Sequence, residues 1–298
     1  MHYVFQKWMV QALTIKILAD SACDLSTART KELSIEIVPL SVQLDDKIYQ
    51  DRINIDPVTV YDAMREGKTV KTSQVALPTF LSVFEESAKR NEPLVYIAFS
   101  SGLSGTYQTA KMAEQEIKET YPDAAIHIID TKCASLGYGL VVLHAAQLAK
   151  DGATLETILE EANDYANRME HIFTVDDLEY LYRGGRVSKT VAFLGTVLKI
   201  KPLLDMEDGK LVPREKIRGS KRVLGRMIEV MGERATTLEQ QTIGISHGDS
   251  LERAEQLAAM IKETFPVKDV IIEMVGAAIG AHSGPGTIAL FFLNEQDH

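Results

Sequence analysis

The segment from residue 94 to residue 110 constrains the fold most, because a run of apolar residues stops there at a loop of serine and glycine. Six apolar residues, 94–99, have the length and composition of a strand buried on both faces, and the residues from Thr106 onward have the pattern of a helix. The loop between them is therefore expected at the carboxyl end of a strand, which is where open α/β sheets bind their ligands.

The residue types in this loop favour an anionic ligand. Ser100, Ser101 and Ser104 supply hydroxyl donors, and Gly102 lets the backbone approach a bound molecule closely. The helix that follows directs its free N–H groups and the positive end of its dipole to the same place. The loop has no lysine and no GK[ST] ending, which argues against a nucleoside triphosphate cradle. A glycine-rich turn capped by its own serines is the alternative interpretation.

Strand-like and helix-like segments alternate through the first half of the chain. Strands are expected at residues 14–20, 35–44, 94–99 and 125–130, and helices at residues 27–33, 56–67, 106–120 and 137–150. This alternation predicts right-handed crossovers and a parallel sheet. A further helix at residues 154–169 ends the region, so we predict an N-terminal parallel-sheet α/β domain at residues 14–169.

The second half, residues 170–298, is predicted to be a C-terminal α/β domain with a mixed sheet. Asp208 and Gly209 stand between two extended runs and are a strong hairpin signal, so part of the sheet is antiparallel. Further strands are expected at residues 171–175, 241–246, 267–275 and 287–293, with helices on both sides of residues 183–186, at 220–234 and at 250–265. Residues 1–13, which hold the single tryptophan, Trp8, form an extension that packs on its own domain or acts as an amphipathic arm.

Composition excludes several classes of protein. A formal net charge of −10 argues against a nucleic-acid partner, because neutralising phosphates needs clustered lysine and arginine. No stretch approaches the ~20 apolar residues of a membrane span, and no small-residue cleavage site follows the first apolar positions, so we expect a cytoplasmic protein without stable membrane anchoring. Cys23 and Cys133 are far apart in sequence, which fits a reducing compartment. The seven histidines show no metal-binding spacing, so no metal site is expected.

Three further polar loops, at residues 71–74, 183–188 and 281–286, interrupt apolar elements. Thr72 or Ser73 is either a ligand contact or the N-cap of a helix that begins near residue 77. The Arg-Gly-Gly-Arg sequence that ends at Arg186 is either a functional cluster or a helix C-cap with a left-handed glycine. His282 stands among small residues that do not bury it well, and a tight turn before the last strand is the alternative interpretation.

A series of motifs follows one order along the chain: ILADSACDL, PLSVQLDD, KTSQ, FSSGLSGTYQTA, IIDTKCASLGYG, VDDLEYLYRGGRVS, LKIKPLL, DGKLVPREKIRG and GAHSGPG. This series resembles the DegV family of bacterial fatty-acid-binding proteins, from residue 15 to the last strand. The resemblance implies two α/β domains, with a long-chain fatty acid in a buried tunnel of the C-terminal domain and its carboxylate at the domain interface. It also implies a DegV-like subunit that is not an enzyme by itself and needs no cofactor. A separate kinase subunit, which carries ATP and Mg, would phosphorylate the presented carboxylate to an acyl phosphate for phospholipid metabolism.

The resemblance also assigns roles to particular residues. Thr72 and Ser101 are expected to bind the carboxylate through their hydroxyl groups, and Arg186, Arg218 and His282 to support phosphotransfer or partner docking near it. Neutral hydroxyls suit a carboxylate that acts as a nucleophile, because a direct arginine fork would stabilise its ground state. The full expected ligand-binding set is Thr72, Ser73, Ser100, Ser101, Gly102, Ser104, His282, Ser283 and Gly284. Residues 191–194, VAFL, are expected to add apolar surface to the acyl pocket.

Two features depart from the family pattern, and other functions stay open. The 13-residue extension leaves the oligomeric state open, and Val75 stands where many relatives have proline, which loosens the alignment of Thr72. An autonomous serine hydrolase would use Ser101 with His282, but Thr106 stands where the GxSxG elbow needs its closing glycine. A non-catalytic sensor of another amphiphilic anion is a further alternative. A dinucleotide-dependent enzyme is disfavoured because no GxGxxG follows the first strand.

Overall fold

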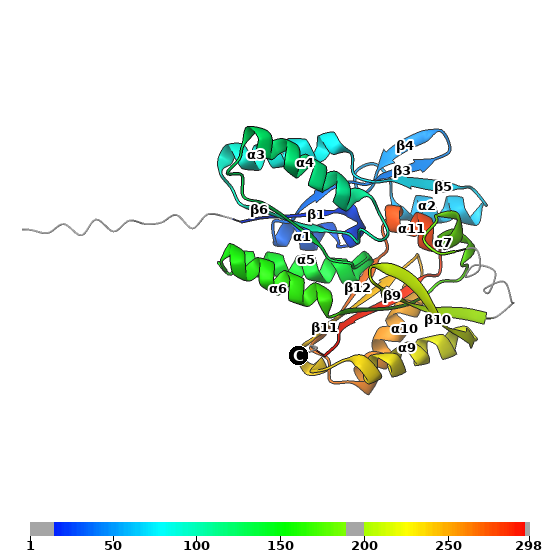
Figure 1. Cartoon of the computed structure of the whole chain (residues 1–298). Helices are drawn as coiled ribbons and strands as arrows, with labels where there is room; N and C mark the ends of the chain where they lie inside the picture. The colour runs from blue at the N-terminus through cyan, green and yellow to red at the C-terminus, as the bar shows by residue number, and fades with distance from the viewer. Residues whose placement is uncertain (1–14, 189–199, 296–298) are drawn as a thin grey trace, which may run out of the picture.

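The first half of the chain forms a four-stranded parallel sheet. The protein is described from a computed structural model, which gives residues 15–188 and 200–295 (Figure 1). The strand order is β2-β1-β6-β7, with β1 at Lys16–Asp20, β2 at Glu36–Val38, β6 at Leu94–Ala98 and β7 at Ile126–Asp130. All three pairings are parallel, which confirms the prediction made from alternating elements. Every residue of β6 is buried, as its unbroken apolar sequence predicts.

Helices flank this sheet on both sides. The helices of the first half are the short 3-10 helix η1 (Ser21–Cys23), α1 (Thr27–Glu32), α2 (Pro57–Arg65), α3 (Leu77–Arg90), α4 (Thr106–Thr120), α5 (Ser135–Lys150) and α6 (Leu155–Asn167), of which α2 packs on β5 (Val70–Ser73) and α11 (Ala277–Ser283) instead of the parallel sheet. Phe80 of α3 packs on Tyr96 of β6, with ring centroids 5.0 Å apart, on one side of the sheet. On the other side lies α5, which contacts β1 and β6 and is buried over its first half.

The expected single strand at residues 35–44 is wrong. The predicted strand is interrupted by a break at Pro39, because proline has no N–H group to donate to a neighbouring strand. The amide of the next residue, Leu40, donates to Ser21 Oγ at 3.1 Å. Residues beyond the break form a second, antiparallel sheet of order β4-β3-β5, with β3 at Ser41–Leu44, β4 at Lys47–Gln50 and β5 at Val70–Ser73. Thr72 and Ser73 therefore lie on a strand. Their interpretation as helix N-caps is also wrong, because Ala76 precedes α3 without any side-chain cap.

The second half forms a six-stranded mixed sheet of order β10-β9-β8-β13-β11-β12. Its strands are β8 (Met169–Thr174), β9 (Ile200–Glu207), β10 (Lys210–Arg218), β11 (Thr242–His247), β12 (Asp269–Met274) and β13 (Ile288–Leu293). Only the β11–β12 pair is parallel within the described sheet. The predicted hairpin is confirmed: Asp208 and Gly209 both have positive φ, at 46° and 73°, as a type I′ turn requires.

The helices of the second half are α7 (Glu179–Arg183), α9 (Ser220–Arg234), the 3-10 helix η2 (Leu238–Gln240), α10 (Leu251–Thr264) and α11 (Ala277–Ser283). The sequence did not indicate α11, since we expected only a loop between β12 and β13. The helix expected after residue 186 and the apolar segment 191–194 lie outside the described residues, as do residues 1–13. The predicted domain division between residues 169 and 170 falls at the first residue of β8 and stays a prediction.

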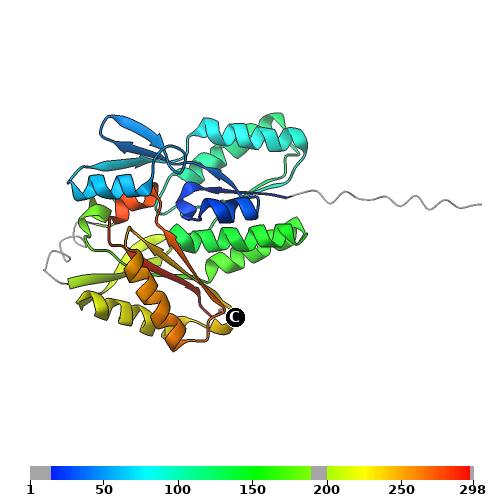
Figure 2. The same ribbon diagram turned by 180° about the vertical axis from the view of Figure 1, so that it is seen from behind.

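The six-stranded sheet separates two apolar layers because its strands alternate. In β13, Ile288, Leu290 and Phe292 pack in the core beneath α9 and α10, whereas Ala289 and Phe291 face the first half of the chain. The α5 helix lies in the space between the two larger sheets and contacts β8, β11 and β13 as well as β1 and β6 (Figures 1 and 2). The two halves therefore share one core, of which α5 is the central element.

Two buried aspartate side chains from the first half, Asp24 and Asp51, hold the start of α11. Asp24 Oδ1 accepts a hydrogen bond from the Gly276 amide at 2.9 Å, and Asp51 Oδ2 accepts one from the Ala278 amide at 3.3 Å. Both groups satisfy free N–H groups at the helix N-terminus. Burial raises the pKa of Asp24 to about 8 and also raises the pKa of Asp51. The position of α11 thus depends on contacts between the two halves.

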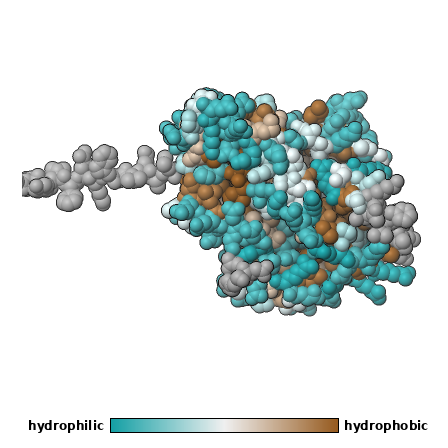
Figure 3. Space-filling view, in the orientation of Figure 1, coloured by the Kyte–Doolittle hydropathy of each residue, from teal (hydrophilic) through white to brown (hydrophobic). Residues whose placement is uncertain are grey.

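The face of the molecule shown in Figure 3 is mostly hydrophilic, with small hydrophobic areas between the layers. Of the helices given for residues 15–188 and 200–295, none is both long and apolar enough to cross a bilayer. Cys23 and Cys133 are buried free thiols, so no disulfide joins them.

Candidate functional site

A cavity of about 470 Å³ lies between the two halves of the chain, on the face of the six-stranded sheet opposite α9 and α10. This volume is in the range of small-molecule sites. Side chains from both halves line it, and the expected placement of the acyl tunnel in the C-terminal half stays a prediction. The apolar lining residues are Leu40, Phe99, Leu103, Ala134, Phe173, Leu181, Met206, Leu211, Val275, Ala278, Ile279, Ala289 and Phe291.

Strand alternation and residue size explain the apolar wall. Ala289 of β13 is directly opposite Phe173 of β8 in the register, so a small side chain lies beside a large one and leaves room above the sheet. The hairpin β9–β10 adds Met206 and Leu211 to the lining. Leu103 comes from the loop after β6, at the carboxyl end of the parallel sheet, where the sequence predicted a ligand.

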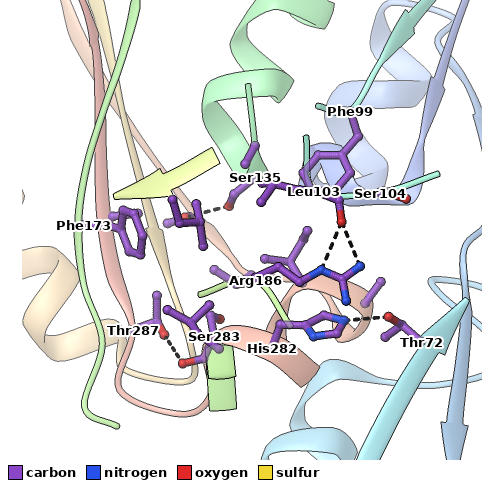
Figure 4. A pocket seen from close by; sticks show the side chains of 18 of the residues that line it. Thr72, Phe99, Leu103, Ser104, Ser135, Phe173, Arg186, His282, Ser283 and Thr287 are labelled. Atoms are coloured by element: carbon purple, nitrogen blue, oxygen red, sulfur yellow. Dashed lines mark hydrogen bonds between the residues drawn. The ribbon is translucent and has the colours of Figure 1, made fainter. Parts of the chain in front are cut away.

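A hydrogen-bonded pair closes the polar end of the cavity (Figure 4). Thr72 Oγ1 of β5 lies 2.6 Å from Nε2 of His282, on the last turn of α11. His282 therefore lies on a helix and is largely enclosed, which corrects the expectation of a poorly buried loop residue. Burial and the positive charge of Arg186 lower the pKa of His282 to about 4, so the ring is neutral at pH 7. The pair offers a hydroxyl and an imidazole without adding charge.

Arg186 supplies the positive charge at this end of the cavity. Its Nε and Nη2 donate to the Leu103 carbonyl at 3.0 and 2.8 Å, and Nη1 donates to the Gly184 carbonyl at 2.5 Å. Three of five N–H groups are used, all on uncharged oxygens, and within the described residues no carboxylate pairs with this guanidinium. Desolvation lowers the pKa of Arg186, but an arginine stays charged at pH 7. A half-buried cation without a counter-charge is a site for an anion.

The two glycines before Arg186 have separate tasks. Gly185 has φ +73°, and the amides of Gly185 and Arg186 donate to the Tyr182 and Leu181 carbonyls, which is the Schellman pattern at the end of α7. The C-cap interpretation is therefore confirmed for Gly185. At Gly184 a Cβ would lie 2.0 Å from Nδ1 of His282, so the missing side chain makes room for the imidazole. Gly185 therefore ends α7, and Gly184 leaves space for the His282 ring.

Ser104 and the N-terminus of α4 form the next part of the polar lining. Ser104 Oγ lies 2.9 Å from Thr106 Oγ1 and accepts the Thr106 amide at 3.2 Å. Gln74 also lines the cavity and donates to Thr109 Oγ1 at 2.5 Å, which ties the end of β5 to α4. Gln74 belongs to the KTSQ motif but was not among the residues predicted for the site.

Ser73 and Ser283, both expected at the site, line the cavity. Ser283 is buried, and its Oγ has no hydrogen-bond partner among the described residues. A buried hydroxyl without a partner is costly unless a ligand or water bonds to it. Gly284 does not line the cavity; it follows α11 with φ +79° and packs against the Tyr180 ring.

Ser100, Ser101 and Gly102 lie outside the cavity lining, contrary to their expected role. Ser100 Oγ donates to the Gly209 carbonyl at 2.7 Å, and a Cβ at Gly102 would lie 2.6 Å from the same oxygen. These two residues therefore pack against the turn of the hairpin β9–β10. Ser101 Oγ donates to Asp130 Oδ2 at 2.5 Å and accepts from Lys132 Nζ at 2.9 Å. Its hydrogen-bond partners in the structure do not include His282, so the Ser101–His282 dyad of a serine hydrolase is not formed.

Arg218 also lies apart from the cavity. It is the exposed last residue of β10, and it does not line the cavity with Arg186 and His282. Asp20 likewise lies elsewhere: it caps η1 through the Ala22 amide and accepts from the Tyr96 hydroxyl at 2.7 Å.

Sequence reasoning missed several buried polar residues of the lining. His171 of β8 is fixed between the Met169 carbonyl and the Ala134 amide, both 3.0 Å away, and burial lowers its pKa to about 4. Ser135 and Ser246 lie 2.9 Å apart across the two halves. His171 stands in an apolar strand sequence, and the two serines in unrelated segments, so only the fold shows that they share one cavity.

The site combines a long apolar surface with one cation, a neutral imidazole and several hydroxyl groups. Such a cavity suits an amphiphile with a single anionic head group. Among the described residues, no cluster of three or more His, Cys, Asp or Glu side chains could hold a metal ion.

Comparison with known proteins agrees with this description. A family model described as "Uncharacterised protein, DegV family" matches residues 14–295. A DegV domain-containing protein of Clostridium perfringens is 43% identical over 282 residues, which are 94% of this chain and 97% of that protein. A solved DegV family protein from Thermus thermophilus, described by its fatty acid binding, superposes with a TM-score of 0.87 at 30% identity, over 95% of this chain and 100% of that one. DegV from Bacillus subtilis, described as a fatty acid binding protein, gives a TM-score of 0.83 at 28% identity, over 95% and 100%.

Proposed function

This chain belongs to the DegV family, and from that premise we propose that it binds a long-chain fatty acid and presents the carboxylate to an ATP-dependent kinase partner. The observation that carries the proposal is the guanidinium of Arg186, which pairs with no carboxylate of residues 15–188 or 200–295 and lies beside the Thr72–His282 pair, at the end of a cavity that is otherwise mostly apolar. The fatty acid binding described for relatives of the same fold supports it.

Burial of the acyl chain supplies most of the affinity. At ~0.8 kcal/mol per CH₂, about 14 methylenes contribute on the order of 10 kcal/mol before ordering costs. A hydrogen bond to the charged head group adds about 1.5–3 kcal/mol. The head-group contacts therefore set the position of the carboxylate more than the total affinity.

The polar groups suit a carboxylate that must react. In the proposed reaction a carboxylate oxygen attacks the terminal phosphorus of ATP on the partner, a P–O bond forms, the bond to ADP breaks, and ADP leaves with the electron pair. Thr72, Ser104 and Ser283 can orient the carboxylate through hydrogen bonds. Arg186, whose Nε and Nη2 donate to the Leu103 carbonyl, supplies positive charge for the bound carboxylate and for the charge that develops during transfer. The partner brings ATP and Mg, so this chain is not an enzyme by itself in the proposal. We place both proteins in the bacterial cytoplasm, in phospholipid metabolism.

A comparison of palmitate with hexadecanol tests the head-group site. Both ligands have the same tail, and their affinities are measured by displacement of a fluorescent fatty acid. We expect the wild type to prefer palmitate by about 10-fold or more, and Arg186→Gln to lose most of that preference while binding hexadecanol normally. Equal preference in the two proteins would refute the assignment of Arg186.

Acyl phosphate formation tests the presentation role. The protein, palmitate, ATP and a bacterial fatty acid kinase are mixed, and the product is trapped with hydroxylamine as the hydroxamate. We expect product only when all four components are present. Tight palmitate binding without any product, with a kinase that is active on another DegV protein, would instead favour a sensor of amphiphilic anions.

A further inference from the structure

The acyl cavity, which is the cavity between the two halves of the chain, has a buried hydroxyl group away from its polar end. Ser246 of β11 is opposite Ala289 of β13 in the sheet, and Ala289 is opposite Phe173 of β8. All three residues line the cavity, and Ser246 is fully buried. Its hydrogen-bond partner, Ser135, lies well apart from His282 in Figure 4. A bound acyl chain therefore meets the Ser246 hydroxyl along its length and not at its carboxylate.

This hydroxyl ends a chain of three hydrogen-bonding side chains. Ser246 Oγ lies 2.9 Å from Ser135 Oγ, which lies 2.5 Å from Asp24 Oδ2. Asp24 Oδ1 accepts the Gly276 amide, and burial raises the pKa of Asp24 to about 8, so at pH 7 its proton is on Oδ2. Oδ2 then donates to Ser135 and Ser135 donates to Ser246. The Ser246 O–H group is left without an acceptor among residues 15–188 and 200–295.

An unsubstituted acyl chain does not satisfy this group. Methylene groups accept no hydrogen bond, and a buried hydroxyl without a partner is costly. His171, which also lines the cavity, offers no acceptor, because its ring nitrogens are taken by the Met169 carbonyl and the Ala134 amide. The small side chain of Ala289 opposite Ser246 leaves room for a substituent on the chain.

We propose that the acyl cavity selects a long-chain fatty acid with a hydroxyl group along its chain, away from the carboxylate, and that Ser246 bonds this group. The inference rests on the proposed function and narrows its class of substrate. A hydroxyl group both accepts and donates, so it also fits the arrangement with an ionised Asp24, in which Ser246 donates to Ser135 and keeps an unfilled acceptor position. The ligand is then fixed at two points, its carboxylate at the polar end and its hydroxyl group at Ser246.

The test compares stearate with hydroxystearates that carry the hydroxyl group at carbon 2 or at one of the even-numbered carbons from 6 to 14. Affinities for wild type and for Ser246→Ala are measured by displacement of a fluorescent fatty acid. We expect one of the isomers with a remote hydroxyl group to bind wild type about 5-fold or more tightly than stearate, and the carbon-2 isomer to gain less than about 2-fold. In Ser246→Ala the preferred isomer should bind about 10-fold or more weakly, whereas stearate should bind as well as before or better, because no donor is left unpaired.

Two further serine variants serve as controls. Ser104→Ala removes a hydroxyl group from the polar end of the same cavity, so it should weaken stearate and the preferred hydroxystearate by the same factor. Ser82→Ala should change neither affinity, because Ser82 is exposed and does not line the cavity. Melting temperatures of all variants show that the proteins compared are folded.

The outcomes separate this inference from the proposed function. If wild type binds stearate and prefers none of the isomers with a remote hydroxyl group, the inference is overturned and fatty acid binding stays intact. Equal losses of both ligands in Ser246→Ala also overturn it, because the serine then only joins the two halves of the chain. If wild type binds neither stearate nor any hydroxystearate, the proposed function fails, and the inference with it.

Discussion

Gly184→Ala is the smallest change that should disable the polar end of the cavity. The added Cβ would lie 2.0 Å from Nδ1 of His282, whereas ordinary contact begins at 3.4 Å. The ring must therefore move by about 1.4 Å. The His282–Thr72 contact of 2.6 Å would then exceed hydrogen-bond range. Because a misplacement of about 1 Å can cost on the order of 100-fold in rate, we expect kinase-dependent acyl phosphate formation to fall by that order.

Gly185→Ala is the matched control for this change. Nothing lies within 4 Å of a Cβ at Gly185, but its φ of +73° makes alanine unfavourable by roughly 1–2 kcal/mol. We expect Gly185→Ala to lower the melting temperature while product formation per folded molecule stays normal. Hydroxamate formation, bound lipid and melting temperature are measured on the same preparations. Normal turnover in Gly184→Ala, or equal loss of turnover in both variants, would show that His282 is not held in place as described.

Three further experiments test other parts of the account. Thr72→Val should lower acyl phosphate formation more than lipid occupancy, because it removes the hydroxyl that bonds His282. Ser101→Ala should leave both quantities near wild type, because the Ser101 hydroxyl bonds Asp130 outside the cavity. A larger loss of product in Ser101→Ala than in Thr72→Val would restore the role first expected for Ser101. Burial raises the pKa of Asp24 to about 8, so folding binds a proton there and stability falls as pH rises from about 4 to 8. We measure the free energy of unfolding in urea for the wild type and for Asp24→Asn. The wild-type value minus the variant value should fall by up to about 1.4 kcal/mol per pH unit over that range. A difference that does not change with pH would contradict the raised pKa. Ala289→Phe should fill the acyl cavity and weaken palmitate by about 10-fold or more, and unchanged affinity would place the ligand elsewhere.

The sequence predicted most of the fold because its signals are local. The buried strand at residues 94–98 and the turn at Asp208 and Gly209 each have a short apolar or turn pattern that matches the structure. The break at Pro39 was missed, because the residues on both sides of it read as one strand. The helix α11 was missed because it is short and rich in alanine and glycine, and its start is held by Asp24 and Asp51 from the other half of the chain.

The site was predicted less completely, because the sequence of a polar loop does not show which of its side chains point into a cavity. Thr72, Ser104, Arg186 and His282 line the cavity, as the order of motifs suggested. Ser100 has the same residue type and nearly the same place in the sequence as Ser104, yet it bonds the hairpin turn instead. The difference depends on how the two halves pack, which no local pattern contains.

Identification of the bound ligand tests the central claim most directly. The protein is expressed in lipid-replete bacterial cells, purified without detergent, extracted with organic solvent and analysed by mass spectrometry. We expect nearly one long-chain fatty acid per wild-type chain, and little in folded Ala289→Phe, whose new ring occupies the acyl cavity. Folded wild-type protein that carries no fatty acid and fails to take up added palmitate would contradict the account.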